Sequence, residues 1–102
     1  VIVGGFNVYP RDVEDALVTH PDILEAGVVG VADSYRGEAL IACVVSRNVS
    51  LTQEAVMEHL TTRLVKYKLP REVRFIDTLP KTSIGKTDKN QLRADVASNP
   101  ST

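Results

Sequence analysis

The sequence lacks tryptophan and carries a single cysteine among its 102 residues. With one thiol no internal disulfide can form, which excludes a small scaffold held together by disulfides. Cys43 lies within the apolar segment 40–45, where a buried structural thiol is expected rather than a reactive one. A reduced cysteine of this kind is typical of a cytoplasmic protein, and we expect that location.

An excess of either charge is also absent. Twelve Lys and Arg residues oppose 13 Asp and Glu residues, for a formal net charge of −1. General binders of nucleic acid or of anionic membranes have a clear basic excess, so no nucleic-acid partner is predicted. The five aromatic residues do not alternate with basic ones, which argues against base stacking on RNA. No apolar run approaches the roughly 20 residues that span a bilayer, so we expect no transmembrane segment.

The remaining composition is that of one globular domain. Apolar residues make up 43% and charged residues 25% of the sequence, close to the averages of folded domains. The sequence opens on the apolar segment 1–3 without an initiator Met, which we interpret as a start inside a longer protein. We expect residues 1–97 to form one domain and residues 98–102 to form a disordered tail.

Hydrophobic periodicity predicts an α+β domain, with helices packed on a small sheet. The sheet should combine an N-terminal hairpin, turning at Gly4-Gly5, with about three central strands. The expected elements are strands around 1–3 and 6–9, a helix from Pro10, strands at 23–31 and 40–46, a helix after Thr52, a strand at 73–76, a loop over 79–86 and a helix from Asp88.

The first candidate for chemistry is the loop Pro80–Lys86. Two lysines, two hydroxyl side chains and Gly85 stand between a proline and the start of a helix. Such a loop can present the Lys86 ammonium to phosphate or carboxylate oxygens, although composition alone favours a plain solvated lysine. The sequence does not extend to a phosphate-binding Walker A motif, because Pro80 stands where the first glycine is needed.

Two further segments have weaker signals. In the segment Gly4–Pro10, paired glycines permit close approach of the backbone to a ligand, and the Asn7 amide offers a donor and an acceptor. A simple hairpin turn is the alternative there, and for residues 33–38 a turn with solvated charges is the default. His20 and His59 lack Cys or acidic partners at metal-ligand spacing, so no metal site is predicted.

Four motifs in order resemble those of the C-terminal domain of the adenylate-forming enzymes. That family includes acyl- and aryl-CoA synthetases, peptide-synthetase adenylation domains and firefly-type luciferases. The motifs are GGFNVYPRDVE at 4–14, VGVAD at 29–33 followed by Gly37-Glu38, YKLP at 67–70 and LPKTSIGK at 79–86. The resemblance covers nearly the whole chain, and the last two motifs favour a fatty-acid or aryl-acid CoA ligase.

The resemblance implies the mobile C-terminal lid of an ATP-dependent acyl-CoA synthetase. In that family a carboxylate attacks the α-phosphate of ATP to give an acyl-adenylate, and coenzyme A then displaces AMP to give a thioester. Lys86 matches the lysine that bridges the carboxylate and the α-phosphate in the first step. Gly4, Gly5 and Asn7 match the face that meets the adenylate and lines the pantetheine tunnel in the second step.

The resemblance also implies ATP, coenzyme A and Mg²⁺ for the full-length enzyme, with Mg²⁺ bound outside this domain. Its partners are then a separate N-terminal domain that binds ATP and the acyl group, a small carboxylic acid and coenzyme A. The chain alone is expected to be inactive. The alternative is a small α+β ligand-binding or interaction module without a part in catalysis, which leaves the Lys86 loop and the Gly4-Gly5 hairpin as coincidences.

Overall fold

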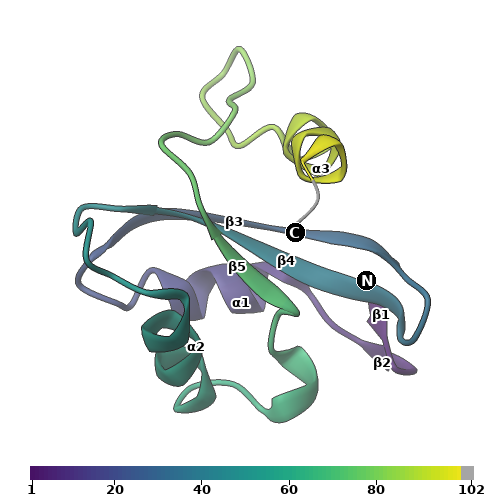
Figure 1. Ribbon diagram of the computed structural model, residues 1–102. Helices are drawn as coiled ribbons and strands as arrows, with labels where there is room; N and C mark the ends of the chain where they lie inside the picture. Colours follow the sequence, from purple (N-terminus) through teal and green to yellow (C-terminus); the bar gives the residue numbers. More distant parts are fainter. Residues whose placement is uncertain (100–102) are drawn as a thin grey trace.

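Figure 1 shows the computed structural model, which describes residues 1–99 as a twisted sheet with helices on both of its faces. The elements are β1 (Ile2–Val3), β2 (Phe6–Asn7), α1 (Pro10–Leu17), β3 (Ile23–Asp33), β4 (Gly37–Ser46), α2 (Gln53–Thr61), a 3₁₀ turn (Lys66–Lys68), β5 (Glu72–Phe75) and α3 (Lys89–Ser98). The α+β class and the predicted order of elements are confirmed. Strands β3 and β4 run further than expected, because they stay paired up to the turn that joins them.

Strand β4 is the centre of the five-stranded sheet. Strand β3 pairs with it in antiparallel orientation from one end to the other. On the opposite side, β5 pairs with it in parallel, and β1 joins it in antiparallel orientation at Val3 and Gly37. The N-terminal hairpin and the three central strands therefore form one sheet, connected through a single residue pair at the hairpin.

The side chains of β4 alternate between two apolar cores. Leu40, Ala42 and Val44 face the larger core, which α1 and α2 cover. Ile41 and Cys43 face a smaller core beneath α3. Since successive side chains of a strand point to opposite faces, burial on both sides explains why residues 40–45 form a continuous apolar run instead of alternating with polar residues.

Two helices begin at the caps that the sequence indicated. The hydroxyl of Thr52 accepts a hydrogen bond from Ala55 N at 3.1 Å at the start of α2. The carboxylate of Asp88 accepts one from Gln91 N at 3.0 Å at the start of α3. Each cap satisfies a backbone donor that the first turn of a helix leaves unpaired. The residue at which each of these helices begins is therefore set by a local interaction.

The C-terminal boundary lies later than the sequence predicted. Helix α3 includes Ser98, and Asn99 N donates to the carbonyl of Asp95 to close its last turn. The guanidinium of Arg74 also donates to the carbonyls of Val96 and Asn99, so the end of the helix is tied to β5. The expected boundary after residue 97 thus falls within the helix, and residues 100–102 of the expected tail lie outside the described part.

Strand β3 lies at the edge of the sheet, and side chains from two helices cover part of its open backbone. Val28 N donates to the Glu14 carboxylate at 2.8 Å, and the Lys89 ammonium donates to the Val28 carbonyl at 2.9 Å. Glu14 and Lys89 also form an ion pair. Because Glu14 belongs to α1 and Lys89 to α3, this contact joins the helices of the two faces around the edge.

Cys43 is buried, with 1% of its surface exposed, as the sequence predicted. Burial raises the pKa of its thiol from the ordinary value of 9.0 to about 11, because the thiolate loses its hydration inside the core. The thiol is therefore protonated at neutral pH. A reactive role for Cys43 does not fit this position.

The buried thiol makes the stability of the fold sensitive to alkaline pH. Cys43 ionises near 9.0 when exposed and near 11 in the folded chain, so the unfolded state loses its proton first. The free energy of unfolding should then fall by about 1 kcal/mol between pH 8 and pH 10 through this group alone. Urea denaturation at the two pH values measures the loss, and the Cys43→Ala variant should lack this part of it. The same pH dependence in both proteins would contradict the prediction.

Candidate functional site

The loop before α3 folds back on itself as a short hairpin. Lys81 pairs with Thr87 in an antiparallel bridge. Within it, Thr82 N donates to the Lys86 carbonyl at 2.7 Å, and Gly85 N donates to the Thr82 carbonyl at 3.0 Å. Gly85 has a φ of 84°, in the left-handed region that favours glycine. A tight turn followed by a glycine in this conformation is a common three-residue hairpin loop, so the backbone itself requires Gly85.

Lys86 has a fixed backbone and an exposed side chain. Its N–H donates to the Thr82 hydroxyl at 3.2 Å, which adds to the contact of its carbonyl with the same residue. Within residues 1–99 its ammonium has neither an ion-pair nor a hydrogen-bond partner, whereas the ammonium of Lys81 pairs with Glu25. The loop thus holds one cation available for an external anion and neutralises the other.

The hairpin of β1 and β2 is a second constrained turn. Val3 and Phe6 pair across a two-residue loop in which Gly4 has a φ of 56° and Gly5 a φ of 86°. This is the geometry of the turns that best match the twist of two strands, and it strongly favours glycine. A Cβ atom at either glycine meets nothing within 4 Å, so conformation and not crowding demands glycine here. Asn7, the last residue of β2, is exposed.

The structure separates the two predicted sets of site residues. Figure 1 shows the loop that carries Lys86 projecting on the α3 side of the sheet. The β1–β2 hairpin, with Gly4, Gly5 and Asn7, lies on the other side at the far end of β4. One orientation of this domain toward a ligand can therefore present only one of the two sets.

A groove of about 640 Å³ runs beside the β1–β2 hairpin. Gly4 and Phe6 line it from the hairpin, and Tyr67 lines it from the 3₁₀ turn. The rings of Phe6 and Tyr67 stack with their centroids 4.4 Å apart and an angle of 18° between their planes. Both rings remain partly exposed, at 53% for Phe6 and 40% for Tyr67, so a planar ligand can pack against them.

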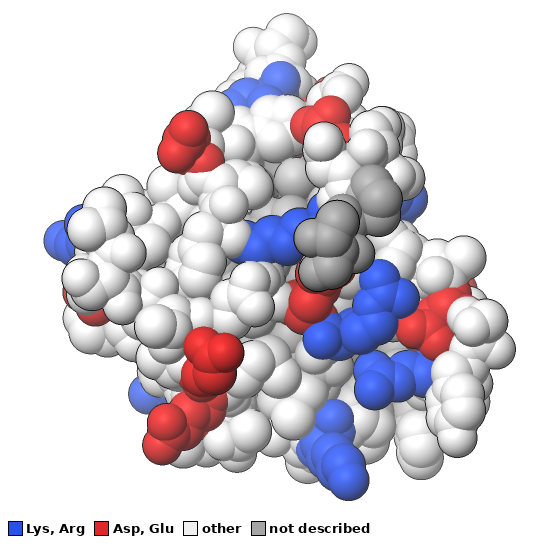
Figure 2. All heavy atoms as spheres, in the orientation of Figure 1, with Lys and Arg blue, Asp and Glu red and all other residues white. Residues whose placement is uncertain are grey.

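Three cationic residues line the same groove, namely Arg36, Lys66 and Arg71. Figure 2 shows basic side chains gathered, with acidic ones between them, in the region where Figure 1 has the 3₁₀ turn and β1. Guanidinium and ammonium groups beside aromatic rings suit a ligand that combines a flat ring with phosphate groups. The sequence did not predict this groove. Its signals were the YKLP motif and the cations on either side of it, but no pattern in the sequence joins them to Phe6.

In the turn from Asp33 to Gly37 the Asp33 carboxylate is hydrogen-bonded within the protein, whereas the sequence suggested a turn with solvated charges. Asp33 Oδ1 accepts hydrogen bonds from Tyr35 N at 2.8 Å and Arg36 N at 2.9 Å, and Asp33 Oδ2 accepts one from Arg71 Nη1 at 3.0 Å. The amides of Arg36 and Tyr35, followed by the Arg71 guanidinium, hold the pKa of Asp33 below its ordinary value. The carboxylate is therefore ionised and engaged on both of its oxygens.

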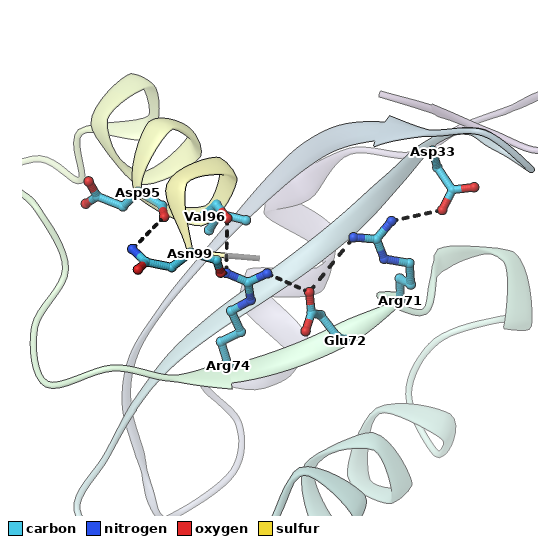
Figure 3. Close-up of polar contacts among 7 residues, drawn as sticks. All are labelled: Asp33, Arg71, Glu72, Arg74, Asp95, Val96 and Asn99. Atoms are coloured by element: carbon cyan, nitrogen blue, oxygen red, sulfur yellow. Dashed lines mark hydrogen bonds and ion pairs between the residues drawn. The ribbon is translucent and has the colours of Figure 1, made fainter. Parts of the chain in front are cut away.

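A row of charged side chains continues from Asp33 along β5 to the end of α3 (Figure 3). The guanidinium of Arg71 lies 3.9 Å from the Glu72 carboxylate, which Arg74 contacts at 2.9 Å. Arg74 in turn donates to the last carbonyls of α3, where a cation is favourable. The row connects the turn beside the β1–β2 hairpin with the helix that follows the Lys86 loop.

The two histidines contact each other across α1 and α2. Their rings meet edge to face, with centroids 4.9 Å apart, and burial followed by the nearby His20 lowers the pKa of His59.

Within residues 1–99 no three His, Cys, Asp or Glu side chains are grouped so that they could hold a metal ion. In the same range no helix is long and apolar enough to cross a membrane.

The chain is similar to known proteins along almost its whole length. The model of the AMP-binding enzyme C-terminal domain matches residues 12–86. The chain is 41% identical over 93 residues to a long-chain-fatty-acid–CoA ligase of Yersinia pestis. The aligned region covers 91% of this chain and 16% of that protein. It is 43% identical over 98 residues to an indoleacetate–CoA ligase of Aromatoleum aromaticum, and this aligned region covers 95% of this chain and 19% of that protein.

Solved structures show the same relation. The ATP-bound MatB of Rhodopseudomonas palustris matches with a TM-score of 0.89 and 37% identity, over 94% of this chain and 19% of that one. A Mycobacterium tuberculosis fatty acyl CoA synthetase matches with a TM-score of 0.92 and 35% identity, over 96% of this chain and 20% of that one. The chain therefore spans about 16 to 20% of the length of these relatives.

Proposed function

Because the chain belongs to the AMP-binding enzyme C-terminal domain family, we propose that it is the mobile lid of an ATP-dependent acyl-CoA synthetase. The full-length enzyme joins a carboxylic acid to ATP as an acyl-adenylate and releases pyrophosphate. It then transfers the acyl group to the thiol of coenzyme A and releases AMP. The observation that carries this proposal is the ammonium of Lys86, which has no partner among residues 1–99 and stands on a constrained hairpin within the most specific of the family's motifs.

Lys86 acts in the first half-reaction. As the carboxylate oxygen attacks the α-phosphorus, negative charge builds up on the oxygens of that phosphate. An ammonium aimed at these oxygens stabilises the transition state more than the ground state, which is the requirement for catalysis. The hairpin around Gly85 contributes by fixing the backbone of Lys86, so that less motion has to be frozen when the site closes.

The β1–β2 hairpin acts in the second half-reaction. Gly4 and Gly5 let the backbone approach the adenylate and the pantetheine arm closely, and the exposed amide of Asn7 lies next to them. The groove beside the hairpin supports this assignment. Its two stacked rings and three cations suit the adenine and the phosphates of coenzyme A.

The substrate we propose is a fatty acid or an aryl acid. The last two motifs favour this class, and relatives of the chain are named for long-chain fatty acids and for indoleacetate. ATP, Mg²⁺ and the acyl group are bound by a separate N-terminal domain, which is the partner of this chain. The buried and unpaired thiol of Cys43 fits a cytoplasmic enzyme. A non-catalytic binding module leaves the Lys86 hairpin without a purpose, and family membership counts against it.

The test is an assay of the full-length enzyme with a panel of carboxylic acids. Pyrophosphate release should require ATP and one class of acid, and thioester formation should require coenzyme A in addition. The matched control is the same enzyme truncated before the present chain, which should lose both activities. The 102-residue chain alone should be inactive because it lacks an ATP site. Absence of pyrophosphate release with every fatty and aryl acid would overturn the proposal.

A further inference from the structure

We propose that Asp33 is a positioning residue for thioester formation. Its carboxylate fixes the turn at residues 33–37, whose Arg36 carbonyl is hydrogen-bonded to Gly4 of the β1–β2 hairpin. The same carboxylate fixes the Arg71 guanidinium at the groove beside that hairpin. The inference rests on the proposed function, because it assumes that the hairpin and the groove act in the second half-reaction. It gives a role to the turn at residues 33–37, which that function leaves without one.

The first link runs from Asp33 to the hairpin through the backbone. One carboxylate oxygen accepts hydrogen bonds from Tyr35 N and Arg36 N, which fixes the orientation of the peptide groups in the turn. The carbonyl of Arg36 then accepts a hydrogen bond from Gly4 N at 3.0 Å. Since β1 pairs with β4 at Val3 and Gly37, this hydrogen bond adds a polar contact between the exposed turn and the residue before β4 to the burial of Val3 in the core.

The second link runs from Asp33 to the groove through Arg71. The other carboxylate oxygen accepts from Arg71 Nη1 at 3.0 Å, while the contact of Arg71 with Glu72 is longer, at 3.9 Å. Figure 3 shows the guanidinium lying between these two carboxylates. Only 11% of the Asp33 side chain is exposed, because the amides of the turn and the Arg71 guanidinium cover its carboxylate. Asp33 thus decides where Arg71 presents its remaining donors to the groove.

The proposal separates the two half-reactions. The hydrogen bonds of Asp33 reach the turn and Arg71, and in the described range none of them reaches the loop that carries Lys86. A change at Asp33 should therefore disturb the hairpin and the groove while leaving the adenylation loop in place. A residue that only maintains stability would affect both half-reactions to the same extent.

The experiment uses Asp33→Asn in the full-length enzyme. Asparagine keeps the size and one carbonyl oxygen, so it still caps the turn, but it cannot present a second, charged acceptor to Arg71. The KM for coenzyme A, measured with supplied acyl-adenylate, should rise by about tenfold, as expected for the loss of one charge-assisted hydrogen bond. Pyrophosphate release in the adenylation step should stay within about twofold of the wild-type rate.

Two further variants make the result specific. Arg71→Met should raise the KM for coenzyme A to a similar extent, and the double variant should be no worse than Arg71→Met alone, because both changes remove one interaction. Thr52→Ala removes the N-terminal cap of α2, and Thr52 is not among the residues that line the groove, so this variant should have a lower melting temperature without a higher KM. Equal loss in both half-reactions for Asp33→Asn, or fully additive effects of the two changes, would overturn the inference.

A Gly5→Val variant separates this inference from the proposed function. If Gly5→Val slows thioester formation while Asp33→Asn has the wild-type KM for coenzyme A, then the hairpin acts as proposed and the contact of Asp33 with Arg71 does not position the groove. If neither variant alters thioester formation, the proposed role of the hairpin itself is wrong. Should Asp33→Asn prove unstable, Arg71→Met tests the same contact from a side chain that is 40% exposed.

Discussion

Replacing Lys86 with alanine in the full-length enzyme should slow adenylation by roughly 100- to 1,000-fold, the usual cost of removing one group that stabilises developing charge in a transition state. Thioester formation from supplied acyl-adenylate should change by less than about twofold. The difference arises because charge builds up on the α-phosphate only while the adenylate forms. Pyrophosphate release in a single turnover measures the first step, and the formation of the thioester from acyl-adenylate measures the second.

The matched control for this experiment lies in the same loop. Lys81 stands on the opposite arm of the hairpin, and its ammonium pairs with Glu25 instead of remaining available. The Lys81→Ala variant should therefore keep most of the adenylation rate. Since the Lys86 side chain is exposed and contacts no charged partner in the described part of the chain, its removal should leave the melting temperature unchanged. An equal loss of both half-reactions in Lys86→Ala would refute the assignment.

The opposite selectivity is expected for Gly5→Val. Gly5 has a φ of 86°, which a β-branched residue adopts only at considerable cost, so the turn must change its shape. A displacement of about 1 Å at a site that orients reactants can cost roughly 100-fold in rate. Thioester formation from supplied acyl-adenylate should fall by about that factor, and pyrophosphate release should remain near the wild-type rate.

Asparagine provides the comparison at the same position. Among residues other than glycine, Asn is one of the few that tolerate the left-handed region, so Gly5→Asn should keep the shape of the turn, and a loss of thioester rate in this variant measures the close approach of the backbone to the ligand. A Cβ atom at position 5 meets nothing within 4 Å, and neither variant should therefore be limited by crowding inside the domain. If Gly5→Val and Gly5→Asn lose the same activity, the added side chain blocks the approach of the ligand, and the shape of the turn is not the cause.

Local signals in the sequence predicted most of the fold. Thr52 and Asp88 cap their helices because a hydroxyl or carboxylate acceptor stands before a helical pattern, and both lie where expected. The apolar run around Cys43 indicated a strand with a buried thiol, which is confirmed, and the structure adds that β4 is buried on both faces. The end of α3 was placed too early, because the contact of Arg74 with its last carbonyls joins distant parts of the chain and leaves no local pattern.

The site was predicted less completely, for the same reason. Lys86 and the two glycines stand in motifs that can be read in order along the chain. The predicted hairpin at Gly4-Gly5 is confirmed, and the structure adds the hairpin that holds Lys86. The stack of Phe6 on Tyr67 and the ion pair of Arg71 with Asp33, which are 38 positions apart, arise only once β1, β4 and β5 lie side by side. Neither residue type nor spacing predicts such contacts, because the topology of the sheet creates them.

The covered edge of β3 should protect the domain from aggregation. In the proposed function the domain is a mobile lid that spends part of each cycle undocked, and an open strand edge would then allow a second copy to add its own strand and begin a fibril. The Glu14 carboxylate and the Lys89 ammonium occupy the donor and the acceptor of Val28, which such an intruding strand would need. Because Glu14 and Lys89 both belong to this domain, they cover the Val28 backbone in every orientation of the proposed lid.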